Sequence, residues 1–218
     1  MKSSSPRRKR STGAAERHGG AGHVRLIGGR WRGRRLPVPD APGLRPSADR
    51  LRETLFNWLQ PDLAGARCLD LFAGSGALGF EAVSRGAAEV VLVESAGNVF
   101  SGLRGSLARL EGDGNGRSGV TGAASAAAVH LVNERAEVFL ANNHRTFDIV
   151  FVDPPFDRDL QRPILQVLAE EGHLASEALV HVEAPAERSF ECIVPAEAGY
   201  RLHRERRFGD VAARLLVR

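Results

Sequence analysis

The stretch Cys68-Leu69-Asp70-Leu71-Phe72-Ala73-Gly74-Ser75-Gly76 is an apolar run that ends in a turn of small residues. The run predicts a buried strand, and the turn leads into a segment, 77–85, that reads as a helix. Glycines in such a turn let a ligand approach the backbone and meet the free N–H groups of the following helix. The stretch therefore predicts a strand–turn–helix unit that binds a nucleoside cofactor.

Strands and helices continue to alternate after this unit. A helix is predicted at 99–110, and strands are predicted at 90–94, 129–132, 147–152 and 178–183. Two further segments, 200–206 and 211–217, predict a closing hairpin with a reversed edge strand. Repeated alternation of this kind indicates an α/β fold, in which helices cover both faces of a mostly parallel sheet.

Glu94 is the acid at the end of the second predicted strand. A carboxylate there is placed to accept hydrogen bonds from the two hydroxyl groups of a ribose. Gly74, Gly76 and Gly79 also satisfy the pattern G-x-G-x-x-G, and Glu94 follows Gly74 by twenty residues, which suits NAD as well. Taken alone, this first motif does not choose between NAD and another nucleoside cofactor.

A second motif, Asp153-Pro154-Pro155-Phe156, directly follows the predicted strand 147–152. An amine on a base ring is a poor nucleophile, because its lone pair is delocalised into the ring. The Asp153 carboxylate and the Pro154 carbonyl can accept the two N–H bonds and direct the lone pair at a sulfonium methyl group, and Phe156 can stack on the base. Prolines fix the backbone here and remove competing donors. The motif favours an amine methyltransferase over a dehydrogenase or a plain strand-end turn.

Basic charge is concentrated at the N-terminal end. Residues 1–59 carry 14 basic and 4 acidic side chains, or +10, whereas residues 60–218 carry 16 basic and 22 acidic ones, or −6. Such a basic end attracts the phosphates of RNA or DNA. The alternative is a solvated, arginine-rich surface without a partner.

The N-terminal segment divides into an arm and an extension. Residues 1–23 are rich in Ser, Gly and Arg and predict a disordered basic arm. Two short strands, 24–27 and 36–38, flank an arginine-bearing turn, and apolar residues at helical spacing then predict a helix that ends at Pro61. This extension is a candidate surface for binding RNA.

The composition excludes several other classes of protein. The longest apolar runs are far too short to cross a bilayer. Cys68 and Cys192 have neither metal-ligand spacing nor the pattern of a disulfide framework, and the histidines are scattered. The sequence therefore predicts a cytoplasmic protein with neither a metal site nor a membrane anchor.

The segments 24–34, 43–46 and 49–59 occur in order with the two motifs, and together they resemble the bacterial RsmD family. The resemblance runs from about Val24 to the C-terminus, except for a predicted flexible insertion at 111–128. It implies a class I, Rossmann-like methyltransferase fold with a seven-stranded, mostly parallel sheet. A small hairpin and helix extension, 24–61, would precede the methyltransferase domain, 62–218.

The resemblance also implies an activity and a partner. The cofactor would be S-adenosylmethionine, and the methyl acceptor would be the N2 amine of a guanine in small-subunit (16S) ribosomal RNA. The target base would be flipped out beside Asp153, as the amine must leave its stack to react. The partner would be an assembled or assembling 30S particle, bound by a monomer of this chain.

The motifs and the resemblance together assign roles to residues. The expected catalytic residues are Asp153, Pro154 and Phe156. The expected cofactor-binding residues are Asp70, Phe72, Ala73, Gly74, Ser75, Gly76, Glu94, Ala136 and Asp153. The expected substrate-binding residues are Pro155, Arg30, Trp31, Arg32, Arg34 and Arg45.

One position departs from the family pattern. Relatives carry Asp or Asn, which would contact the adenine amine, where Arg135 stands in this chain. Arginine cannot accept that hydrogen bond. Either the backbone of Ala136 or the side chain of Glu134 is therefore expected to take over the contact.

Two other functions stay open from the residues. An acid or amide followed by Pro-Pro-aromatic also serves DNA adenine and protein glutamine methyltransferases, although glutamine-directed enzymes generally carry Asn where Asp153 stands. No target-recognition domain for specific DNA is visible in the sequence. A nucleic-acid-binding module without catalysis is favoured only by Arg135, and the intact Asp70, Glu94 and Asp153 argue against it.

Overall fold

The computed structural model of the chain describes residues 22–38, 49–112 and 127–218. Most of the predicted arm, most of the predicted insertion and the candidate RNA contact Arg45 lie outside these residues. The ends of the arm and of the insertion differ from the prediction. His23 already begins the first strand, residues 111 and 112 complete a helix, and Ala128 begins a strand.

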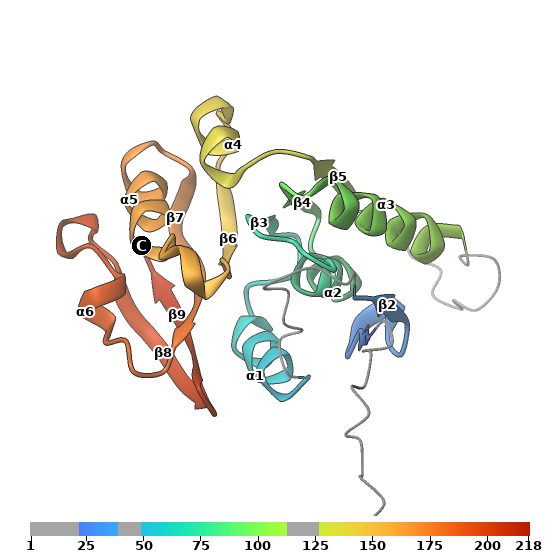
Figure 1. Cartoon of the computed structure of the whole chain (residues 1–218), viewed down its shortest axis with the longest axis horizontal. Coiled ribbons are helices and arrows are strands. Elements are labelled where there is room, and N and C mark those ends of the chain that lie inside the picture. Colours follow the sequence, from blue (N-terminus) through green and yellow to red (C-terminus); the bar gives the residue numbers. More distant parts are fainter. Residues whose placement is uncertain (1–21, 39–48, 113–126) are drawn as a thin grey trace, which may run out of the picture.

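A seven-stranded sheet forms the centre of the molecule, in the order β5-β4-β3-β6-β7-β9-β8 (Figure 1). Its strands are β3 (Arg67–Asp70), β4 (Glu89–Val93), β5 (Ala128–Val132), β6 (Phe147–Val152), β7 (Leu174–Pro185), β8 (Arg201–Phe208) and β9 (Val211–Val217). The first five strands in this order, β5, β4, β3, β6 and β7, are parallel to their neighbours in that group. The strand β9 is antiparallel to both of its neighbours, β7 and β8. The predicted α/β fold with a seven-stranded, mostly parallel sheet is confirmed.

The closing hairpin of β8 and β9 is confirmed, but the predicted position of its reversed strand is wrong. The reversed strand is β9, which lies between β7 and β8. Its sequence, Val-Ala-Ala-Arg-Leu-Leu-Val, is largely apolar and is buried inside the sheet, whereas β8 is rich in arginine and is exposed. A charged strand suits the edge, because it discourages pairing with another chain.

Helices cover both faces of the sheet. On one face, α1 (Asp49–Leu59), α2 (Ala77–Ser84) and α3 (Gly97–Gly112) contribute to a core that includes Phe56, Phe80 and Leu103. On the other face, α4 (Ala136–Asn142), α5 (Gln161–Glu170) and α6 (Phe190–Ile193) contribute to a second core, which includes Leu140, Leu165 and Ile193. Two shorter 3₁₀ turns, η2 (Phe156–Arg158) and η3 (Ala196–Ala198), lie in this half of the chain. The sequence predicted α1 to α3 but none of α4 to α6.

The N-terminal extension is a hairpin of β1 (His23–Arg25) and β2 (Arg35–Pro37), joined through the 3₁₀ turn η1 (Gly29–Trp31). Leu26, Trp31 and Leu36 belong to the same apolar cluster as α1 and α2. The extension therefore shares the core of the main sheet, and its Val24 and Val38 form a further small cluster with Ala77 of α2.

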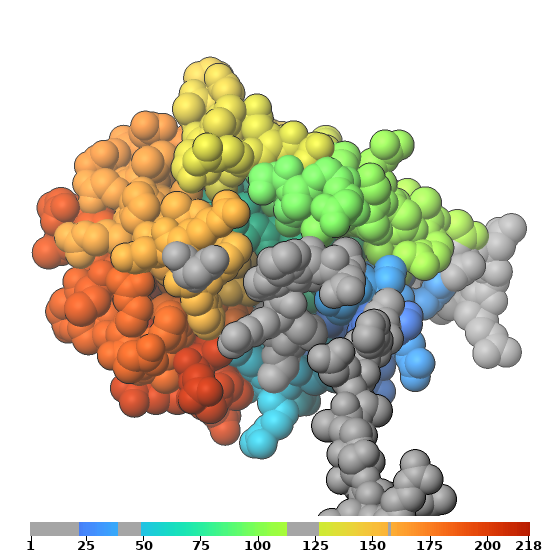
Figure 2. Space-filling model, in the orientation of Figure 1, coloured from blue at the N-terminus to red at the C-terminus, as the bar shows by residue number. Residues whose placement is uncertain are grey.

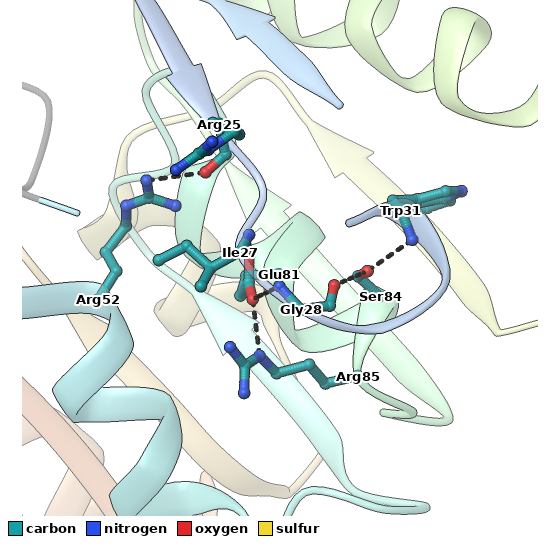
Figure 3. A network of polar contacts seen from close by, with 8 residues as sticks. All are labelled: Arg25, Ile27, Gly28, Trp31, Arg52, Glu81, Ser84 and Arg85. Carbon is teal, nitrogen blue, oxygen red and sulfur yellow. Dashed lines mark hydrogen bonds and ion pairs between the residues drawn. The ribbon is translucent and has the colours of Figure 1, made fainter. Parts of the chain in front are cut away.

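Buried polar contacts fasten this hairpin to α2 (Figure 3). The fully buried Glu81 carboxylate accepts hydrogen bonds from the backbone N–H groups of Ile27 and Gly28, both at 2.7 Å, and from Arg85 Nε at 2.6 Å. The Ser84 hydroxyl, one turn along, accepts the backbone N–H of Trp31 and donates to the Gly28 carbonyl. Since α2 starts at the glycine turn 74–76, the hairpin is joined directly to the helix that follows the predicted cofactor site.

Within the described ranges, we find no helix that is both long enough and apolar enough to cross a membrane.

Candidate active site

A cavity of about 660 Å³ opens at the carboxyl ends of the parallel strands. This is the edge of an α/β sheet where ligands generally bind. The cavity is lined by the predicted site residues Asp70, Phe72, Ala73, Gly74, Ser75, Glu94, Ala136, Asp153, Pro154, Pro155 and Phe156. The fold thus brings the two motifs together, although 77 residues separate Gly76 from Asp153 in the sequence.

Gly76 is the one predicted cofactor residue that does not line the cavity. It begins α2 in the left-handed conformation, with φ of 80°, and a Cβ atom there would collide with the Phe80 ring. Gly79 sits against β4, where an added Cβ would lie 2.6 Å from Leu92. Gly76 is needed for the turn, and Gly79 is needed for the packing of α2 against the sheet. The G-x-G-x-x-G spacing, which also suits NAD, is therefore explained by local structure.

Glu94 is held at the cavity wall by backbone donors. Its Oε2 accepts the N–H of Gly74 at 3.0 Å, and its Oε1 accepts the N–H of Ala96 at 2.7 Å. A carboxylate oxygen has two lone pairs, so both oxygens can accept a further hydrogen bond. Glu94 can therefore bind a ribose diol while it orders the glycine turn.

Asp70 lies behind the turn at the end of β3, and only 2% of it is exposed. Its Oδ2 accepts the backbone N–H of Gly79 at 3.1 Å. Burial raises the pKa of Asp70 to about 7, and the charge of Glu94 adds to this effect, while the N–H groups of Gly79 and Phe72 oppose it. The fold therefore favours the protonated form of this carboxyl below neutral pH.

This raised pKa predicts a pH dependence of stability. Between about pH 4 and pH 7 the folded chain keeps a proton on Asp70 that the unfolded chain has released, so the free energy of unfolding falls as the pH rises through this window. Asp70→Asn removes the titration and keeps an oxygen for the Gly79 N–H. We expect the variant to show a shallower fall, measured by urea unfolding across this window without cofactor. A slope equal to that of the wild type would contradict the assignment.

The Asp153-Pro154-Pro155-Phe156 segment leaves β6 at the cavity. Pro154 is buried, Asp153 and Phe156 are half-buried, and Phe156 begins the turn η2. All four residues of the segment line the cavity, so the residues that carry a carboxylate, a proline carbonyl and an aromatic ring are neighbours on its wall. This set can accept the N–H bonds of a flat, amine-bearing ring and stack on its face.

Sequence reasoning missed Glu183, which also lines the cavity and is 3% exposed. It lies near the end of β7, the strand next to β6, and its Oε1 is 3.3 Å from Nε2 of the buried His181. The sequence could have indicated this residue, because the predicted strand 178–183 ends in Glu183, as the predicted strand 90–94 ends in Glu94. A second carboxylate therefore stands beside the strand that carries Asp153.

Arg135, the residue that departs from the family pattern, lines the cavity together with Glu134, Ala136 and Glu137. The Arg135 side chain is 69% exposed and pairs with Glu137 at 3.2 Å. Ala136, the first residue of α4, is buried. The two groups that the sequence offers in place of the missing acid are the Ala136 backbone and the Glu134 side chain. Both residues line the cavity beside Arg135.

The predicted RNA-contacting residues of the hairpin have different environments. Arg30 and Arg32 are exposed and Arg34 is half-buried. Trp31 is only 7% exposed, and its ring packs edge-on against Phe80 with centroids 6.2 Å apart. The sequence leaves Trp31 open between packing onto the core and stacking on RNA. In the structure the ring packs the hairpin against α2, and the Arg30 guanidinium carbon lies 4.4 Å from the ring centre.

The wall of the cavity is predominantly acidic. Its charged residues are the acids Asp70, Glu94, Glu134, Glu137, Asp153 and Glu183 and the bases Arg135 and Arg158. Such a wall suits a ligand with positive charge, such as a sulfonium group. The volume also lies in the range typical of small-molecule and cofactor sites.

The sheet order, with one reversed strand next to the edge, and the acidic cavity at the carboxyl ends fit one class of enzyme. The fold and the site define an S-adenosylmethionine-dependent methyltransferase. Glu94 and the turn 72–75 would hold the nucleoside part of the cofactor, and the second motif would hold the methyl acceptor.

Comparison with known proteins gives the family. Residues 24–217 match the family described as "Conserved hypothetical protein 95", and the chain belongs to this family, the RsmD family. It is 48% identical over 201 residues to ribosomal RNA small subunit methyltransferase D of Escherichia coli K12, covering 92% of this chain and 93% of the relative. The Haemophilus influenzae protein of the same name is 40% identical over 196 residues, covering 89% and 93%. The solved structure of the E. coli protein yhhF has a TM-score of 0.76 at 47% identity, covering 90% of this chain and 98% of that one.

Proposed function

We propose that the chain transfers a methyl group from S-adenosylmethionine to the N2 amine of a guanine in small-subunit ribosomal RNA. The observation that carries this proposal is the Asp153-Pro154-Pro155-Phe156 segment on the wall of the cavity that also holds Glu94 and the glycine turn. The names of the E. coli and H. influenzae relatives support ribosomal RNA as the substrate class.

The residues of this chain act mainly by orientation. The bound cofactor supplies an electrophilic methyl group on sulfur. The Asp153 carboxylate and the Pro154 carbonyl accept the two N–H bonds of the guanine amine, and this turns the nitrogen lone pair toward the methyl group. Phe156 stacks on the base and Pro155 limits its movement. Positioning of this kind can supply a large part of a rate enhancement.

The hairpin supplies the sequence-independent part of the affinity. Arg30, Arg32 and Arg34 would bind phosphates, and Arg45, outside the described residues, would extend this surface. The proposed substrate is the assembled or assembling 30S particle in the cytoplasm, bound by a monomer.

The test is methyl transfer from labelled S-adenosylmethionine to small ribosomal subunits that lack their guanine-N2 methyl group. Naked ribosomal RNA and duplex DNA serve as parallel acceptors, and nucleoside analysis identifies the product. Labelled N2-methylguanosine from the subunits is the expected result. Label only in DNA or in protein would select the alternative amine methyltransferases, and cofactor binding without transfer to any acceptor would favour a module without catalysis.

A further inference from the structure

The edge strand β8 carries a second basic surface, far in sequence from the N-terminal segment. Every residue from 201 to 207 is exposed, and Phe208 is half-buried. The strand holds the basic residues Arg201, Arg204, Arg206 and Arg207 and the single acid Glu205. The net charge of −6 over residues 60–218 conceals this local excess, because the acids lie elsewhere.

Three of the four arginines project from one face of the sheet. The β8–β9 register pairs Arg201 with Val217, Arg204 with Leu215, Arg206 with Ala213 and Phe208 with Val211. Residues that face each other across a strand pair point to the same side. Leu215 belongs to the apolar cluster of α1 and α2, so Arg201, Arg204 and Arg206 lie on the α1 side of the sheet.

A register shift makes this arrangement possible. It lies between Leu202 and Arg204, and it places Arg201 and Arg204 on the same face although they are three residues apart. Glu205 and Arg207 point to the opposite face, where Glu205 pairs with Arg214 at 3.0 Å. The one acid of the strand is thus kept away from the row of three arginines.

The row leads to the candidate active site. Phe208 and Val211, at the turn between β8 and β9, line the cavity, and the Arg206 guanidinium lies 5.5 Å from the centre of the Phe208 ring. From Arg201 to Phe208 the strand spans about 23 Å at its usual rise per residue. The basic row therefore begins at the rim of the cavity and runs along the edge of the sheet.

The N-terminal hairpin approaches the cavity from another side. Figure 2 shows the red surface of the β8–β9 hairpin on one side of the cyan surface of α1, and the blue surface of the N-terminal hairpin on the other. Val38, just after β2, and Leu51 of α1 also line the cavity. Two arginine-bearing surfaces thus flank the cavity, with α1 between them.

The guanidinium groups of this row are available to a ligand. In the part of the chain that the structure describes, neither Arg204 nor Arg206 makes an ion pair with a carboxylate. Arg201 has only a long contact of 3.9 Å with Glu177, and both side chains are largely exposed. Exposed guanidinium groups in a row suit phosphate oxygens, to which arginine donates paired hydrogen bonds.

We propose that Arg201, Arg204 and Arg206 bind the phosphate backbone of the RNA substrate on one side of the target base, while the N-terminal hairpin binds it on the other. This inference rests on the proposed function, in which an RNA base enters the cavity. Holding the backbone on both sides of the cavity would favour extrusion of the base between the two contacts. Binding of an acidic protein to the same row is a different proposal, which the experiment separates.

The test compares Arg204→Gln/Arg206→Gln with Arg207→Gln, which removes a charge from the same strand but on the opposite face. Affinity for small ribosomal subunits is measured against KCl concentration, and kcat and KM for methyl transfer are measured alongside. Loss of two phosphate contacts should lower the slope of log affinity against log salt by about 1.4 to 1.8. KM should rise while kcat is retained, and Arg207→Gln should match the wild type. Arg30→Gln/Arg32→Gln serves as the comparison for the N-terminal surface.

Other results overturn the proposal. An unchanged salt slope in Arg204→Gln/Arg206→Gln would overturn it. An equal effect of Arg207→Gln would also overturn it, because the effect would then depend on the charge of the strand and not on the face from which the arginine projects. Self-association with normal RNA affinity would mean that the arginines only protect the sheet edge. Because binding is measured apart from methyl transfer, a wild type that binds subunits but does not methylate them counts against the proposed function alone.

Cross-linking identifies the molecule that touches the row. Arg206→Cys is made in a Cys192→Ser background, because Cys192 is exposed and Cys68 is buried, and the new thiol carries a photoreactive group. Cross-links to ribosomal RNA are expected. Cross-links to a ribosomal protein without RNA would overturn the proposal in favour of a protein partner.

Discussion

Asp153→Ala is expected to lower the rate of methyl transfer by about 10²- to 10³-fold, the size of effect seen when one oriented hydrogen-bonding group is removed from an active site. The Asp153 carboxylate is the charged acceptor in the second motif, so its loss leaves the amine lone pair without direction. Cofactor affinity should change far less, because Glu94 and the glycine turn form a separate part of the wall. Single-turnover methyl transfer and calorimetric binding of S-adenosylmethionine measure the two quantities.

A matched control lies on the same strand. Asp148→Ala removes a carboxylate from the other end of β6, where Asp148 pairs with Arg67 at 3.2 Å, away from the residues that line the cavity. This control should keep the normal rate. Near-normal turnover in Asp153→Ala would remove Asp153 from the proposed mechanism.

Glu81→Ala is expected to lower the free energy of unfolding by about 3–5 kcal/mol, the cost of breaking a buried ion pair from one side. Glu81 is fully buried and accepts hydrogen bonds from Ile27, Gly28 and Arg85. The variant leaves two backbone N–H groups and a guanidinium without their acceptor. Urea denaturation measures the loss, and hydrogen exchange should show the N-terminal hairpin opening first.

Glu53→Ala provides the control for this experiment, because Glu53 is an exposed glutamate on a helix of the same face. Its effect should stay within about 0.5 kcal/mol. The double variant Glu81→Ala/Arg85→Ala should lose less stability than the sum of the single variants, since the two side chains share one contact. If Glu81→Ala unfolds at the same urea concentration as Glu53→Ala, the network does not anchor the hairpin.

Local patterns explain which elements could be predicted. Strand 147–152 was predicted with its observed bounds, since five of its six residues are apolar and Asp153 and a proline pair follow it. By contrast, α4 has 7 residues and α6 has 4, too few to show a helical period. The helix α5 does show such a period, because Ile164, Leu165 and Leu168 are buried on one face, and the sequence would have supported its prediction.

Long-range packing decides the environment of Trp31, which the sequence leaves open between core packing and stacking on RNA. Trp31 stands between two arginines and looks exposed in the sequence, yet the hairpin turns it onto Phe80, which is 49 residues away. The sequence indicates that a tryptophan lies in a basic turn, but not which side of the turn faces α2. That choice follows from the contacts of Glu81 and Ser84 with the turn.

The sequence by itself determined the α/β alternation, the glycine turn at the end of β3 and the Asp153-Pro154-Pro155-Phe156 segment, because each of these depends on residues that are neighbours in the chain. Only the tertiary structure decided that β9 lies between β7 and β8, that Glu183 joins the cavity, and that three arginines of β8 share a face. These features depend on strand order and register. Both are set by which apolar surfaces pack together across the sheet, and a single irregularity of register moves every side chain beyond it to the other face.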